Sequence, residues 1–193
     1  ANGAATRDIQ VNRATLNLVN SSVQAVSANG VGLSGGQADI SSSTINSDRF
    51  GLAMGPDPTG AGAVATVSDT SISGGMTGAL VSGAGDLTLV RSSLTGTGVT
   101  ARGLRVASGT VTATESTITG NSDGIQLGGD RTHSDVALIF SDTRVEGLNG
   151  SAIVVDTLGQ GPVTANIAVL NGSQLSASNG VLMDVRNGAE GNL

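Results

Sequence analysis

The sequence predicts an all-β fold, a right-handed three-sided parallel β-helix of about seven coils. Three observations predict it: a repeat of 22 to 30 residues, alternation of apolar and polar residues within each repeat, and Gly- and Asn-rich segments between the alternating runs. Alternation with a period of two is typical of a β-strand. Gly and Asn are unfavourable inside helices, so we expect the segments between the runs to be corners.

The repeat is clearest in residues 111–127, VTATESTITGNSDGIQL. Its first and third positions are apolar and alternate with polar residues. The first position is occupied by Leu16, Ala38, Ala65, Leu87, Val111, Leu138 and Ala168, and the third by Leu18, Ile40, Val67, Leu89, Ala113, Phe140 and Leu170. These two columns predict a strand that buries one face in every coil.

Three further columns follow in each repeat. A hydroxyl marks the sixth position, in Ser21, Ser43, Thr70, Ser92, Ser116, Thr143 and Ser173. A branched residue marks the eighth, in Val23, Ile45, Ile72, Leu94, Ile118, Val145 and Leu175, and a small one the tenth, in Ala25, Ser47, Gly74, Gly96, Gly120, Gly147 and Ala177. Stacked coils would align the hydroxyls, so we expect a Ser/Thr ladder along the axis, since a buried hydroxyl needs a partner.

A second pair of apolar residues closes each repeat and predicts a third strand per coil. The pairs are Ile9/Val11, Val31/Leu33, Leu52/Met54, Leu80/Ser82, Leu104/Val106, Ile125/Leu127, Ile153/Val155 and Val181/Met183. Three strands in about 22 residues make a coil with three sides. One such coil cannot bury its own inward face, so the stacking of coils must supply the core.

Composition agrees with a narrow stacked interior. The 193 residues contain no Cys, Trp, Tyr or Lys, and Phe50 and Phe140 are the only aromatic residues. The hydrophobic fraction of 38% is too high for a disordered chain and comes from small aliphatic residues. We therefore expect a single domain over residues 1–193, as one segment of a longer protein.

Three insertions enlarge the same corner of the predicted coils, at residues 55–64, 128–137 and 156–167. Insertions into solenoid repeats lie on one face, which is often the binding face. Their polar residues are candidate binding residues: Asp57, Thr59, Asp130, Arg131, His133 and Asp156. The alternative interpretation is neutral surface elaboration, because extending a loop costs little free energy.

The outward fifth position carries the most concentrated charge. Asp69, Arg91, Glu115 and Asp142 would stack about 4.8 Å apart in consecutive coils. One interpretation is a groove for a polyanion or glycan, or a cation site between Glu115 and Asp142. The other is an exposed ladder of charges, which contributes little to stability.

Other chemistry is limited by the residues available. The net charge of −6 argues against nucleic-acid binding. A single histidine without cysteine cannot form a His-rich transition-metal site. A phosphate-binding loop of the Gly-x-x-x-x-Gly-Lys type needs a lysine, and no Gly-x-Ser-x-Gly nucleophile motif occurs. We therefore expect no cofactor and no enzymatic activity.

The coils resemble those of pertactin-like passenger domains of bacterial autotransporters. Residues 168–183, AVLNGSQLSASNGVLM, carry the likeness best, and it extends over residues 9–185. The resemblance implies export through the periplasm, display on the bacterial cell surface or secretion, and adhesion to a host-cell or matrix protein or glycan, or self-association. It implies contact with a membrane only through a C-terminal β-barrel translocator, which this sequence lacks.

Two alternatives remain open at this point. A polysaccharide-active β-helix enzyme of the pectate-lyase type would need acidic residues, or calcium-binding acids with a basic residue, clustered in a cleft along one sheet. A two-partner-secreted, haemagglutinin-like β-helix would share the fold and the adhesive role without a covalently attached barrel.

Overall fold

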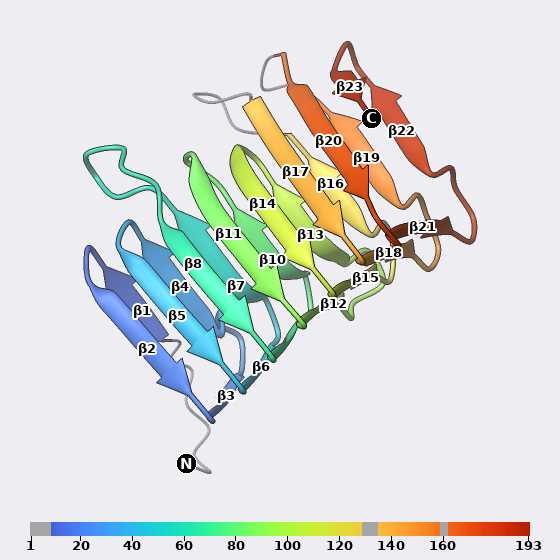
Figure 1. Cartoon of the computed structure of the whole chain (residues 1–193). Helices are drawn as coiled ribbons and strands as arrows, with labels where there is room; N and C mark the ends of the chain where they lie inside the picture. The colour runs from blue at the N-terminus through green and yellow to red at the C-terminus, as the bar shows by residue number, and fades with distance from the viewer. Residues whose placement is uncertain (1–8, 129–134, 159–161) are drawn as a thin grey trace.

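The computed structural model describes residues 9–128, 135–158 and 162–193. These residues form three parallel β-sheets wound into a right-handed solenoid of about seven turns, so the predicted fold class is confirmed (Figure 1). Each strand pairs with its equivalents one coil earlier and one coil later, in parallel. No helix long and apolar enough to cross a membrane occurs in the described ranges.

The strands are named by sheet. Sheet A contains β1 (Ile9–Asn12), β4 (Val31–Ser34), β7 (Phe50–Gly55), β10 (Thr77–Val81), β13 (Arg102–Val106), β16 (Ile125–Leu127), β19 (Ile153–Asp156) and β22 (Met183–Arg186). Sheet B contains β2 (Thr15–Val19), β5 (Gln37–Ser41), β8 (Val64–Ser68), β11 (Gly85–Val90), β14 (Gly109–Thr114), β17 (Asp135–Ser141), β20 (Thr164–Leu170) and β23 (Glu190–Asn192). Sheet C contains β3 (Ser22–Ala25), β6 (Thr44–Ser47), β9 (Ser71–Gly74), β12 (Ser93–Gly96), β15 (Thr117–Gly120), β18 (Arg144–Gly147) and β21 (Gln174–Ala177).

The branched column at the eighth position lies along the axis as predicted. Its seven members, Val23 to Leu175, are consecutive register partners in sheet C. From Ile45 to Val145 these side chains are fully buried. Phe140 is the one large aromatic side chain in the core, and small aliphatic residues fill the rest. The interior is therefore a stack of similar apolar layers, as the composition predicted.

One predicted apolar pair in sheet A is wrong by one residue. In β10 the inward residues are Ala79 and Val81, not Leu80 and Ser82. Ala79 lies between two large inward side chains, Leu52 on one side and Leu104 on the other. A methyl group suffices there, so the larger neighbour Leu80 faces outward.

The last coil departs from the predicted register in three places. Its inward residues in β20 are Ile167 and Val169, so the predicted Ala168 and Leu170 face outward. In β22 the inward pair is Met183 and Val185, and Val181 precedes the strand. Between β20 and β21 one extra residue, Gly172, lengthens the corner, which restores Ser173 and Leu175 to their predicted columns. The apolar residues on both faces of this coil explain the misassignment.

The corner between sheets B and C, which we call the ladder corner, contains the predicted Ser/Thr column. Its hydroxyls do not bond to one another. From Ser43 to Ser173, each accepts a hydrogen bond from the backbone N–H of its equivalent one coil earlier: Ser92 Oγ from Thr70 N at 3.2 Å, and Ser116 Oγ from Ser92 N at 3.1 Å. From Ser21 to Thr143, each also donates to the carbonyl two residues earlier in its own coil, as Ser92 does to Val90 at 2.8 Å. The buried hydroxyls are thus satisfied twice.

The corner between sheets A and B, which we call the insertion corner, carries the three insertions. Parts of the two later insertions are strand: residues 135–137 begin β17, and residues 164–167 begin β20. Ala63, inside the first insertion, is fully buried in the core. The insertions therefore lengthen sheet B as well as forming loops.

Candidate functional site

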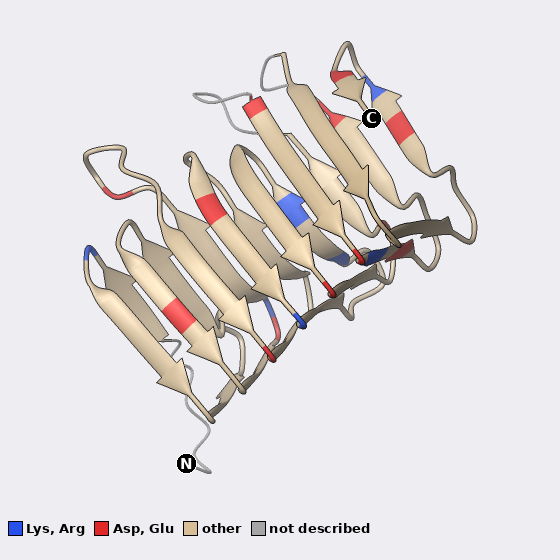
Figure 2. Cartoon of the chain, in the orientation of Figure 1, with Lys and Arg blue, Asp and Glu red and all other residues tan. Residues whose placement is uncertain are grey.

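The charged column at the fifth position lies at the ladder corner, and Figure 2 shows its red and blue segments at the ends of β8, β11, β14 and β17. Every member has a left-handed backbone, with φ between 47° and 52°: Asn20, Ser42, Asp69, Arg91, Glu115, Asp142 and Asn171. The last member is Asn171, although counting along the repeat from Ala168 would give Gly172, because Gly172 is the extra residue of this corner. Asn and Asp adopt this conformation readily, whereas Arg and Glu do so at a cost.

Two members of this column form an ion pair. The Arg91 guanidinium donates two hydrogen bonds to the Asp69 carboxylate, from Nε to Oδ1 at 2.8 Å and from Nη2 to Oδ2 at 2.9 Å. This contact lowers the pKa of Asp69 and raises the pKa of Arg91. The two side chains are 46% and 53% exposed, so water screens their attraction. The column is therefore a surface ladder of charges.

The remaining two acids of the column do not complete a cation site. Asp142 accepts hydrogen bonds from Gly172 N at 3.1 Å and from Ser141 Oγ at 3.3 Å, which uses both of its carboxylate oxygens. Glu115 stands one coil away and contributes charge attraction to Arg91. Within the described ranges no group of three or more His, Cys, Asp or Glu side chains could hold a metal ion.

Asp57 and Thr59, in the first insertion, form a local turn that is anchored to the scaffold. Asp57 Oδ1 accepts hydrogen bonds from Thr59 Oγ1 at 2.6 Å, Thr59 N at 2.8 Å and Ala61 N at 3.0 Å. Arg13, two coils earlier, donates to Asp57 Oδ2 at 2.6 Å. These bonds, led by the one from the Thr59 side chain, lower the pKa of Asp57 to about 2. Its side chain is 8% exposed, so Asp57 holds the loop in place rather than facing a ligand.

Asp156, the predicted binding residue of the third insertion, also has a local role. Its carboxylate, at the end of β19, accepts hydrogen bonds from Asn187 Nδ2 at 2.8 Å and Leu158 N at 2.9 Å. The first of these contributes most to lowering the pKa of Asp156. The other predicted residues, Asp130, Arg131 and His133, lie outside the described residues. Of the insertion residues that the structure describes, Asp57, Thr59 and Asp156, none contacts the charged column.

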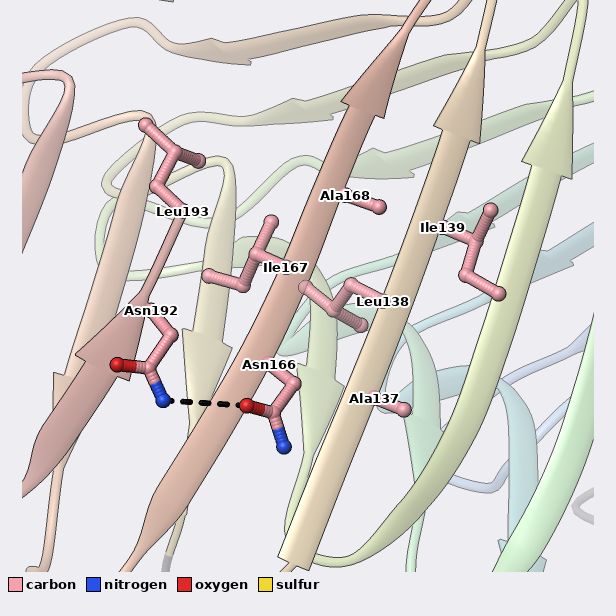
Figure 3. Close-up of a pocket in the computed structure, with 8 residues that line it drawn as sticks. All are labelled: Ala137, Leu138, Ile139, Asn166, Ile167, Ala168, Asn192 and Leu193. Carbon is pink, nitrogen blue, oxygen red and sulfur yellow. Dashed lines mark hydrogen bonds between the residues drawn. The ribbon is translucent and has the colours of Figure 1, made fainter.

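Two surface hollows were not predicted. One lies against the outer face of sheet B, between β17, β20 and the last two residues, and Figure 3 shows its lining side chains. Ala137, Ile139, Ala168 and Leu193 make it largely apolar, while Asn192 donates to Asn166 Oδ1 at 3.1 Å at its edge. Ala168 faces outward and lines this hollow. The repeat pattern assigned Ala168 to the interior, so it did not predict the hollow.

The other hollow is polar and lies where the chain passes from sheet C to sheet A. Asp123, Ser151, Asp184 and Arg186 are among its lining residues. Its charged groups bond within the hollow: Ser151 N donates to Asp123 Oδ1 at 3.0 Å, and Arg186 binds Asp184 on the same strand. Contact with Asp184 raises the pKa of Arg186.

Arg102 and Arg105 on β13 were also missed. Arg105 stands between the inward residues Leu104 and Val106, and this alternation predicts that it faces outward. The sequence does not show whether each arginine has an acidic partner, because such partners lie in neighbouring coils.

Comparison with protein families places these observations in context. A family described as the right-handed β-helix region matches residues 8–190. Comparison with curated proteins and with solved structures gave no match.

Proposed function

Because the chain belongs to the right-handed β-helix family, we propose that it is a segment of a surface-displayed autotransporter passenger that acts as an adhesin or as a self-association scaffold. The likeness of its coils to pertactin-like passengers supports this role. Its partner would be a host-cell or matrix protein or glycan, or another copy of the chain. It would reach the bacterial surface through the periplasm.

The observation that carries the proposal is the outer face of sheet B. Its central outward row consists of short side chains in consecutive coils: Asn17, Asp39, Thr66, Thr88, Thr112, Ile139 and Ala168. The described strands of this sheet contain no Lys or Arg, and Figure 2 shows only acidic segments on them. The central row of this face is therefore regular, and no Lys or Arg side chain interrupts the described strands.

Such a face suits contact with a large flat partner. Short side chains lose little rotamer entropy when a partner covers them. Threonine offers both a methyl group and a hydroxyl, so it can pack and hydrogen-bond in the same contact. The apolar hollow beside Ile139 adds a place where a partner's aliphatic side chain could be buried. Repetition along the solenoid axis multiplies these weak contacts.

The test places long charged side chains on this face of the complete passenger, displayed on otherwise non-adherent bacteria. The double variant Thr88→Arg, Thr112→Arg should reduce cell aggregation or binding to host cells about tenfold or more, because buried unpaired charges oppose contact. The matched control is Thr95→Arg, Thr119→Arg on the outer side of sheet C, which should bind like the wild type.

The loops offer a second arm to the same assay. Removing residues 57–62 restores the usual five-residue spacing between Met54 and Ala65 and keeps the buried Ala63. If the outer face of sheet B is the adhesive surface, this deletion should leave binding unchanged. Unimpaired binding by the sheet B variant would refute the assignment of the face. Turnover of an acidic polysaccharide by the purified protein would instead favour the enzyme alternative.

A further inference from the structure

The described arginines differ in whether a carboxylate accompanies them. Arg13, Arg91 and Arg144 each lie within 3.0 Å of a carboxylate oxygen, and Arg186 binds Asp184. Arg102 lies 4.0 Å from the nearest such oxygen, on Asp123. Arg105 has no carboxylate partner among the described residues. Arg49 also lacks a carboxylate partner among the described residues, but it is exposed and lies over the Phe50 ring at 6.0 Å. Arg102 and Arg105 are thus the described arginines that are both partly buried and poorly neutralised.

Both arginines belong to β13 of sheet A, which has blue segments in Figure 2. In the outward row of this sheet Arg105 lies between Leu80 on β10 and Gln126 on β16. Arg102 begins the same strand, next to Thr77. Both arginines are half-buried, and the Nε atom of each is buried with no hydrogen-bond partner in the part of the chain that the structure describes.

This arrangement is unfavourable as it stands. A buried N–H donor without an acceptor costs free energy, and a partly desolvated charge costs more. Burial, together with the nearby charge of Arg102, lowers the pKa of Arg105. An anion bound between the two guanidinium groups would satisfy the donors and remove the repulsion.

We propose that Arg102 and Arg105 form a binding site for an oxyanion group, such as a sulfate, phosphate or carboxylate, on the outer face of sheet A. Guanidinium groups bind such groups through two parallel N–H···O bonds. The amide of Gln126, one coil away, is a further donor beside the site. The inference goes beyond the adhesive role and does not depend on it, because anion binding is measured on purified protein without cells.

The first experiment titrates the purified protein with sodium sulfate, at ionic strength held constant with sodium chloride, and follows backbone amide shifts by NMR. The wild type should show saturable shifts centred on β13. Arg105→Gln should weaken sulfate binding about tenfold, the loss of one charge-assisted contact. The matched control is Arg144→Gln, which removes an arginine already paired with Glu146 on sheet C and should change the affinity less than about twofold.

The source of the oxyanion is resolved by changing the probe. Inorganic phosphate, a sulfated oligosaccharide and an uncharged oligosaccharide of equal length are compared with inorganic sulfate. A sulfated oligosaccharide that binds about tenfold tighter than sulfate, and loses this advantage in Arg105→Gln, identifies an acidic saccharide as the ligand. Equal affinities identify a site for the free anion. Shifts that never saturate, or that the Arg144→Gln variant loses equally, would overturn the proposal.

Thermal unfolding separates binding from folding. Sulfate should raise the Tm of the wild type more than that of Arg105→Gln, because a ligand of the native state stabilises it. Without sulfate, Arg105→Gln should melt at or above the wild-type Tm, since it removes a poorly paired charge. If that variant does not fold, Arg105→Lys retains the charge without the fork and should bind sulfate several-fold more weakly. Equal sulfate-induced shifts in all variants would contradict the site.

Discussion

The ladder corner and the insertion corner differ greatly in how far their length varies from coil to coil. At the ladder corner one left-handed residue and one hydroxyl recur in every coil, and a single extra residue, Gly172, is the only departure in length. At the insertion corner the usual five residues are more than doubled in three coils. Two corners of one solenoid therefore follow different rules.

Hydrogen bonding explains the difference. At the ladder corner the left-handed residue also donates its N–H to the next coil, as Arg91 does to the Thr114 carbonyl at 3.0 Å. The following hydroxyl receives one backbone N–H and donates to one carbonyl, so an extra residue needs a partner of its own, which Gly172 N has in Asp142 Oδ1 at 3.1 Å. At the insertion corner the loop 55–64 makes its own turn around Asp57, and Arg13 and the Ser34 hydroxyl bind this turn to earlier coils. A corner can lengthen where its polar groups are satisfied locally.

The largest expected effect comes from a charge in the column beside the ladder corner. Ile118→Asp places a carboxylate between Leu94 and Val145, which are fully buried, and should destabilise the fold by more than about 4 kcal/mol. The control is Thr119→Asp, one residue later on the outer side. Chemical unfolding followed by circular dichroism compares the two, and a cooperative Ile118→Asp protein of unchanged stability would contradict the inward orientation of this column.

The second test removes one rung of the ladder. Ser92→Ala deprives the buried Thr70 N–H of its acceptor and the Val90 carbonyl of a donor, so the free energy of unfolding should fall by about 1–3 kcal/mol. The control is Ser93→Ala, which removes an exposed hydroxyl that contacts Ser71. In this variant the free energy of unfolding should fall by less than about 0.5 kcal/mol. Urea unfolding measures both variants. Equal losses of stability would mean that the buried ladder hydroxyl contributes no more than an exposed one.

Backbone strain at the ladder corner allows a stabilising change. Glu115 has a φ of 50°, which Asn adopts more easily than Glu. Glu115→Asn should therefore raise the free energy of unfolding by about 0.5–1 kcal/mol. Glu115→Gln removes the same charge but keeps the strain and should unfold like the wild type. A gain in both variants would point to charge, not conformation.

The smallest effect concerns pH at the insertion corner. Because the pKa of Asp57 falls from 3.8 to about 2 on folding, its carboxylate stabilises the native loop above pH 4, and this contribution is lost as the pH falls through about 2. Asp57→Asn keeps the turn acceptor but loses the charge. The difference in Tm between wild type and Asp57→Asn should therefore shrink between pH 4 and pH 2. A difference that stays constant over this range would contradict the lowered pKa of Asp57.

The sequence predicted the ladder corner better than the insertion corner for a physical reason. Hydroxyl, branched and small residues recur at fixed spacing where backbone bonds forbid slippage, so the columns through Ser92, Leu94 and Gly96 were read correctly. In sheet A, where Leu80 faces outward and Ala79 inward, hydrophobicity alone misassigns the register. The register of β10 depends on how the inward side chain fits between Leu52 and Leu104, which belong to the neighbouring coils.

The candidate sites show the same limit. Stacking of the charged column could be predicted, since Asp69 and Arg91 hold equivalent positions in the repeat. The anchoring of Asp57 by Arg13 could not, because the loop crosses an intervening coil. The outward orientation of Arg105 follows from alternation, but its partial burial and the lack of an acidic neighbour depend on the register of three coils.

Native-state hydrogen exchange tests the contrast between the corners most directly. The backbone amides of Thr70, Ser92 and Ser116 should exchange only through global unfolding, since each is held within the ladder. The amides of Asp57, Thr59, Gly60 and Ala61 should exchange through local opening, faster by about two orders of magnitude or more, without loss of the core. Equal protection at the two corners would contradict the account.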